Sequence, residues 1–233
     1  DNYLLFPKYI LEGIEIESDK VELDELSFDF DDIVHWSDMC HFHYCNGGAE
    51  WKREPDAVFE CADHSLTISP HRYGTMPFIP SREVYLSQTV VFTLRPKSVE
   101  SLDWFLEIAN RIKLLIMLGI QRKVVFNELR FHRQTNAQYQ NDMYCLSKEH
   151  ALHINLIKAK ETNDVHFFSH LFSFNSLKDH PEIYSAWMNN YKMMRPIIDL
   201  RLLDFLYPDS PAEVIFLNLM QALESFHARF ICD

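Results

Sequence analysis

Apolar and polar residues alternate along several short segments in the part of the chain before residue 175. Leu26, Phe28 and Phe30 alternate with polar neighbours, which is the pattern of a half-buried β-strand. Comparable segments, some of them rich in β-branched and aromatic residues, lie at positions 40–45, 58–61, 66–69, 84–94, 123–131, 138–146, 152–157 and 165–174. This part of the chain is therefore predicted to be rich in β-structure.

A helical pattern interrupts the predicted strands between residues 99 and 118. Apolar residues recur there at helical spacing, and Ser98 before them is a suitable N-cap. Gly119 suits the left-handed residue that often closes a helix. We therefore predict a helix embedded in the β-rich region, with Phe105 and Ile112 facing the core of that region.

After Pro181 the pattern becomes helical and stays helical. One helix is predicted from about residue 182 to Arg195, because Pro196 has no amide proton and should end or kink it. A second helical run follows at residues 197–206. These runs make the last part of the chain predominantly helical.

The change from alternating to helical patterns sets the predicted architecture. We expect an α+β protein in which a β-sandwich or barrel-like domain with an embedded helix is followed by a helical segment. The change of pattern places the β-rich domain at residues 1–179. Residues 180–233 then form a helical linker and the start of a further helical domain.

The last predicted helix, residues 210–232, begins with Ser210 as its N-cap and Pro211 at the first helical position, while Glu213 completes a capping box. The helix carries an apolar stripe that needs a partner. The stripe consists of Val214, Leu217, Leu223, Phe226 and Phe230. Such a helix can pack back onto its own domain, or it can open a bundle that continues after residue 233.

The segment FLNLMQALESFH, residues 216–227, resembles the opening helix of the HEPN domain in ApeA-like proteins. These are bacterial abortive-infection proteins that pair a β-rich N-terminal domain with a C-terminal helical HEPN ribonuclease. Upstream features are similar to that family's N-terminal domain: the sequence IVHW at 33–36, the strand-to-helix stretch at 84–118, and IYSAW at 183–187 leading to RPII at 195–198.

The resemblance implies a sensor or regulatory portion of an antiphage protein whose HEPN ribonuclease lies mostly after residue 233. It also implies early strands before residue 1, a phage-derived trigger, RNA bound through the HEPN region, and a homodimer. HEPN ribonucleases carry an Arg followed four to six residues later by a His, and no Arg in this chain has such a partner. Glu224, His227 and Arg229 are therefore expected at most to support a catalytic site whose motif lies elsewhere.

The charge and the glycine content of the chain argue against two classes of function, general nucleic-acid binding and nucleotide-cofactor binding. The chain has 22 Lys and Arg against 34 Asp and Glu, a formal net charge of −12, so its body repels phosphates and is a poor general nucleic-acid binder. Its five glycines form neither a phosphate-binding loop nor a dinucleotide fingerprint, and no cofactor is expected. A local group of basic residues is interpreted as a solvated strand edge. It comprises Arg122, Lys123, Arg130, His132 and Arg133.

The sequence CHFHYC at residues 40–45 contains residue types that bind zinc, so a metal site is one interpretation of it. On a strand His41 and His43 share a face and can share one ion, whereas Cys45 lies ~13 Å from His41 along a straight strand. Further ligands would have to come from elsewhere, for example Cys61 or His64. Because structural zinc sites usually pair cysteines as Cys-x-x-Cys, which is absent here, we predict no zinc.

Three function hypotheses follow. The first is the regulatory portion of an antiphage protein, and the second is a non-catalytic interaction scaffold that dimerises through its terminal helix. The third is a metal-binding hydrolase built on His41 and His43. The five cysteines show no disulfide spacing, and neither a signal peptide nor a run of 18 apolar residues is present, so a cytoplasmic location without membrane association is expected.

Overall fold

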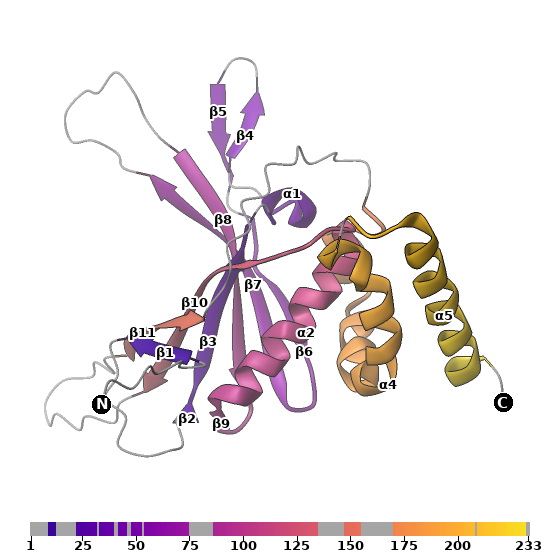
Figure 1. The fold of residues 1–233 in the computed structure, drawn as a ribbon. Helices are drawn as coiled ribbons and strands as arrows, with labels where there is room; N and C mark the ends of the chain where they lie inside the picture. The colour runs from indigo at the N-terminus through magenta and orange to yellow at the C-terminus, as the bar shows by residue number, and fades with distance from the viewer. Residues whose placement is uncertain are drawn as a thin grey trace, which may run out of the picture. The chain divides into compact units, whose positions relative to one another are not determined.

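Figure 1 shows the fold in a computed structural model. The structure describes residues 9–12, 22–31, 33–39, 42–45, 48–52, 54–74, 86–134, 147–154, 170–207 and 209–231. The chain divides into two compact units. The first comprises Asp1–Glu107 and Val125–Asp164, and the second comprises Ile108–Val124 and Val165–Asp233.

The first unit is built on a seven-stranded antiparallel sheet with the strand order β1-β11-β10-β3-β8-β7-β6. Its strands are β1 (Tyr9–Glu12), β3 (Glu25–Phe30), β6 (Ala57–Glu60), β7 (His64–Gly74), β8 (Leu86–Pro96), β10 (Phe126–Gln134) and β11 (Ser147–Ile154). Two small sheets pair β2 (Glu22–Leu23) with β9 (Glu100–Ser101), and β4 (Phe42–Cys45) with β5 (Gly48–Trp51). A single helical turn, α1 (Val34–Ser37), follows β3.

Alternation along β3 gives the main sheet one apolar face and one polar face. Leu26, Phe28 and Phe30 are buried, whereas the residues between them are only half-buried. The ring of Phe28 stacks on that of Phe92 in β8, with centroids 5.4 Å apart, and Phe30 stacks on Phe126 in β10 at 4.9 Å. These aromatic contacts join the three central strands and form the core of the first unit.

The embedded helix is confirmed as α2 (Leu102–Ile120). It begins three residues later than predicted, and Ser101 rather than Ser98 caps it: the Ser101 hydroxyl accepts a hydrogen bond from the Trp104 N–H at 3.3 Å. Phe105 is fully buried and meets Phe131 of β10 edge-on, with ring centroids 6.0 Å apart. The predicted core position of Phe105 is therefore confirmed, while Ile112 is also buried but belongs to the second unit.

The α2 helix ends differently from the prediction. Gly119 lies inside the helix, and Gln121 takes the left-handed conformation with φ of 57°. The side chain of Gln121 donates to the Leu118 carbonyl and accepts a hydrogen bond from Arg201. These two bonds hold a non-glycine residue where glycine is usually preferred.

The α+β class with an embedded helix is confirmed. Among the described residues the main sheet is open, with β1 and β6 at its edges. On the apolar face the first turns of α2, rather than a second large sheet, provide Phe105 as the packing partner. The predicted strands at 138–146, and most of the one at 165–174, lie outside the described residues. Residues 170–173 form no strand, and Phe174 begins a helix.

The second unit contains α3 (Phe174–Asp179), α4 (Pro181–Leu206) and α5 (Ala212–Phe230). In this unit the later part of α2 contacts α4, because Trp187 Nε1 donates to the Arg111 carbonyl at 3.1 Å. The guanidinium of Arg111 also lies 4.8 Å from the ring centre of Tyr191.

The helix does not end at Pro196, which was one of the two predicted outcomes, because α4 runs through it as one helix of 26 residues. Proline removes one backbone hydrogen bond at this point. Buried side chains on both sides of it, Tyr191 before and Ile198 and Leu202 after, hold the helix together through tertiary packing.

The last helix begins one residue later than predicted, at Ala212 instead of Pro211. Pro211 occupies the N-cap of α5 and its carbonyl accepts from the Val214 N–H at 2.9 Å, so Ser210 does not cap the helix. The helix packs on α4 through the buried Ala222 and through Arg229, which donates to the Met193 carbonyl at 2.7 Å. Among the described residues no helix is long and apolar enough to cross a bilayer.

The packing of α2 predicts a large cost for Phe105→Ala. The change removes a fully buried ring and leaves a cavity, so the free energy of unfolding should fall by roughly 3–5 kcal/mol. Val99→Ala is a suitable control because Val99 is 57% exposed, and it should change stability by less than about 0.5 kcal/mol. Urea denaturation of both variants provides the measurement. A loss for Phe105→Ala no larger than the control would show that this ring does not anchor the helix.

Candidate functional site

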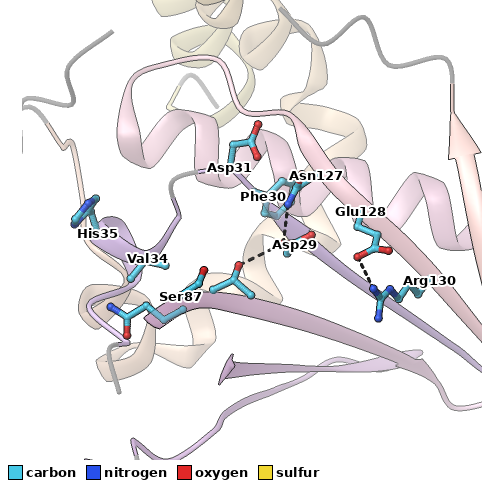
Figure 2. A pocket seen from close by; sticks show the side chains of 11 residues that line it. Asp29, Phe30, Asp31, Val34, His35, Ser87, Asn127, Glu128 and Arg130 are labelled. Atoms are coloured by element: carbon cyan, nitrogen blue, oxygen red, sulfur yellow. Dashed lines mark hydrogen bonds and ion pairs between the residues drawn. The ribbon is translucent and has the colours of Figure 1, made fainter. Parts of the chain in front are cut away.

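The polar face of the main sheet carries a hollow of about 620 Å³. Its lining comes from α1 and from the three central strands β3, β8 and β10, together with the residues after β3. Asp29, Phe30, Asp31, Val34, His35, Ser87, Gln88, Thr89, Asn127, Glu128 and Arg130 line it. Figure 2 shows Asp29 in the middle of this set, with His35 towards one end and Arg130 towards the other. The hollow is thus a polar recess built around one carboxylate.

The register of the sheet places the Asp29 side chain in this hollow on the polar face. Phe28 and Phe30 point to the apolar face, so Asp29 between them points to the polar face. The register of β10 shifts between Phe126 and Glu128, and this irregularity leaves Asn127 without a partner on β3. A β-bulge of this kind re-aims a side chain, and the Asn127 amide Nδ2 donates to Asp29 Oδ2 at 3.2 Å.

Asp29 is held by neutral donors. Thr89 of β8 donates its hydroxyl to the same oxygen, Asp29 Oδ2, at 3.3 Å, so both neighbouring strands contact the carboxylate (Figure 2). Among the described residues no Lys, Arg or His lies within ion-pair distance of Asp29. Burial raises the pKa of Asp29, and this effect outweighs the hydrogen bonds from Asn127 and Thr89, which lower it.

A smaller hollow of about 240 Å³ adjoins the first and shares Asp29, Glu128 and Arg130 with it. We call the two hollows together the Asp29 groove. Glu128 and Arg130 form an ion pair at 2.8 Å (Figure 2), and the groove extends past them to His71 and His132. The groove therefore runs across the polar face over several strands.

The basic group of the sequence does not lie on a strand edge, as its interpretation required. β10, which carries Arg130 and His132, lies inside the sheet between β11 and β3. His132 Nε2 lies 3.8 Å from a carboxylate oxygen of Glu25, and Arg130 pairs with Glu128. Arg130 and His132 therefore each lie close to a carboxylate on the polar face.

Comparison with known families identifies the family of this chain. Residues 2–187 match the family model of ApeA N-terminal domain 1. The chain belongs to this family. The match includes every described strand of the main sheet and the whole Asp29 groove, and it ends within α4. No curated protein and no solved structure matches the chain.

Three residues proposed to support a HEPN site lie on α5, which follows the part matched by the ApeA family model. Glu224, His227 and Arg229 are all exposed. Glu224 and His227 are three residues apart and share one side of the helix, whereas Arg229 turns towards α4 and bonds the Met193 carbonyl. The structure therefore groups the first two and gives Arg229 a packing role, and their part in catalysis stays a prediction.

The alternative metal site falls largely outside the described residues. His41 lies outside them, and His43 is described only as a strand residue of β4 opposite Glu50. Cys61 is buried and in no disulfide, and His64 Nδ1 lies 2.7 Å from Asp63 Oδ1. In the part of the chain that the structure describes, no three His, Cys, Asp or Glu side chains come together as a metal site. Both the zinc alternative and the predicted absence of zinc stay predictions.

Sequence reasoning did not single out Asp29, Thr89 or Asn127. The alternation of β3 was readable and already placed Asp29 opposite the buried phenylalanines. The bulge at Asn127 and the order β10-β3-β8 were not readable, because both arise from pairing between segments far apart in the chain.

The raised pKa of Asp29 predicts how stability depends on pH. Between the ordinary value of 3.8 and the raised value, the folded state holds more protons at this site than the unfolded state. The stability that Asp29 contributes is therefore full below this window and is lost as pH rises through it. The difference in unfolding free energy between wild type and Asp29→Asn should accordingly decrease with rising pH.

Denaturation at a series of pH values measures this difference. Asp56→Asn, which changes an exposed carboxylate outside the groove, is the matched control. Its unfolding free energy should depend on pH through this window as that of wild type does. A pH-independent difference between wild type and Asp29→Asn would contradict the assignment, as would an NMR titration in which Asp29 has an ordinary pKa.

Proposed function

We propose that this chain is the sensor or regulatory portion of an ApeA-type antiphage defence protein whose HEPN ribonuclease lies mostly after residue 233. The observation that carries the proposal is the match of residues 2–187 to ApeA N-terminal domain 1, which supports a role in abortive-infection defence. In this proposal residues 1–179 form the sensor domain, residues 180–233 lead into the HEPN domain, and the protein acts in the cytoplasm.

Two properties of the chain support a regulatory rather than a catalytic role. The sequence contains no HEPN Arg–His motif, and its net charge of −12 disfavours RNA binding by this portion. The Asp29 groove instead offers a recess of the size that small ligands or single side chains occupy. A phage-derived trigger would bind the sensor domain, and RNA would bind the HEPN region.

The exposed side of α5 supports a helical partner. The five residues of the predicted stripe are each between 39% and 63% exposed. A better-aligned row on this helix follows the 3-4-3-4 spacing of a coiled-coil seam. This row consists of Phe216, Leu219, Leu223, Phe226 and Phe230. Because Ala222 and Arg229 already face α4, the row is free for further helices of a HEPN bundle, and such a bundle is expected to form a homodimer.

The same apolar row favours one alternative function. A non-catalytic interaction scaffold would use it directly for dimerisation, with no ribonuclease following. The metal-hydrolase alternative rests on His41 and His43 alone, and no described contact favours it.

The proposal predicts that the purified chain does not cleave RNA, whereas the protein continued past residue 233 does. Phage challenge of cells that express the continued protein should show protection, and the protection should be lost when the Arg or His of a downstream HEPN motif is changed. RNA cleavage assays on both proteins complete the test. Cleavage by the chain alone, abolished by Glu224→Gln or His227→Ala, would contradict the proposal that ribonuclease activity requires the sequence after residue 233.

The α5 row predicts a change in hydrogen exchange. Fully burying one such side chain is worth ~1.5–3 kcal/mol, so the four exposed members of the row leave the helix without much of its potential stabilisation. Backbone amides of residues 212–230 should therefore exchange readily in the chain and become protected when the downstream sequence is restored. Residues 181–206 of α4 serve as the internal reference. Strong protection of α5 in the monomeric chain, unchanged by the downstream sequence, would show that the helix belongs to this part alone.

A further inference from the structure

We propose that the Asp29 groove binds an organic cation, an ammonium or guanidinium group, with the Asp29 carboxylate as its counter-ion. This inference rests on the proposed sensor function and names the chemistry that the sensor domain recognises.

The donors around Asp29 orient its carboxylate without cancelling its charge. The Asn127 amide and the Thr89 hydroxyl are both neutral, and both bind Oδ2, at 3.2 and 3.3 Å. They come from the two strands that flank β3, so the position of the carboxylate is set by the sheet itself. A carboxylate fixed in this way is preorganised for a ligand that brings positive charge.

The lining charges leave a negative surplus. Glu128 is paired with Arg130 at 2.8 Å, and among the described residues of the larger hollow no other Lys or Arg is present. Asp29 and Asp31 remain as carboxylates on the same wall. A half-buried carboxylate without a cationic partner is costly, and its raised pKa reflects this cost. A bound cation would offset the cost and lower that pKa, whereas an anion would increase the cost.

The recess suits an organic group better than a metal ion. In the described part of the chain no three metal-ligating side chains converge here, and Asp29 Oδ2 already accepts two hydrogen bonds. A volume of about 620 Å³ leaves room for a lysine or arginine side chain or for a small amine. Ser87 and Thr89 add hydroxyls to the same wall, which can accept the remaining N–H groups.

NMR titration of the chain tests the proposal with three probes. The first is a blocked Gly-Arg-Gly peptide, and the second is agmatine, a small free molecule that carries a guanidinium and an ammonium group. The third is the same peptide with citrulline, a neutral isostere of arginine. Arginine or agmatine should shift the amide signals of residues 88–90 and 127–129. The citrulline peptide should bind at least roughly tenfold more weakly, as expected for the loss of a charge-assisted hydrogen bond.

Asp29→Asn should weaken binding of the cationic probes to a similar extent, while the control Asp56→Asn should bind as wild type does. Binding of the peptide alone points to a polypeptide trigger, and binding of both cations points to a small amine, so either result supports the proposal. Equal binding of arginine and citrulline peptides to wild type, or no shifts in the groove, overturns it, and this comparison does not depend on any variant folding.

Failure here is distinguishable from failure of the proposed function. If no probe binds the groove but the protein continued past residue 233 still protects cells through its HEPN motif, the ligand chemistry is wrong and the sensor proposal stands. If cations bind and that protein gives no protection, the groove exists and the defence function is wrong.

Discussion

The aromatic packing between β3, β8 and β10 is the interaction on which the rest of the first unit depends. Phe28 stacks on Phe92, and Phe30 stacks on Phe126, so these rings hold β8 and β10 in register with the apolar face of β3. A slip of one residue would turn these rings to the polar face and bring Asp29 into the core. The cost of such a slip fixes the register, and the register positions everything on the opposite face.

The Asp29 groove is a direct consequence of that constraint. Asp29 cannot leave its half-buried position without moving the two phenylalanines beside it, so the sheet maintains a carboxylate whose pKa is raised by burial. The bulge on β10 supplies Asn127 as a donor, and β8 supplies Thr89. Aromatic packing on one face of the sheet thus holds an electrostatically unfavourable carboxylate on the other face, an arrangement typical of binding sites.

The second unit is stabilised by contacts between helices. α4 is stabilised by buried residues along its length and by contacts with the later part of α2, so it tolerates Pro196. α5 has only one covered side, and its apolar row from Phe216 to Phe230 is well exposed except at Leu219, which is half-buried. The match to the family model ends within α4, so α5 with its apolar row follows the matched part of the chain.

Local periodicity determined much of this protein. The strand at Leu26–Phe30, the helix that carries Phe105, the helical character after Pro181 and the resemblance to ApeA-like proteins all follow from residues near one another in the chain. Such patterns report which face of an element is apolar, because that depends only on the spacing of neighbours. Tertiary structure alone decided the strand order, the bulge at Asn127, the left-handed Gln121 and the unbroken α4. Each of these depends on contacts between distant segments: β10 with β3, Arg201 with Gln121, and α2 with α4. Asp29 shows both contributions, since its own strand assigns it to the polar face, but only the neighbouring strands build the groove around it.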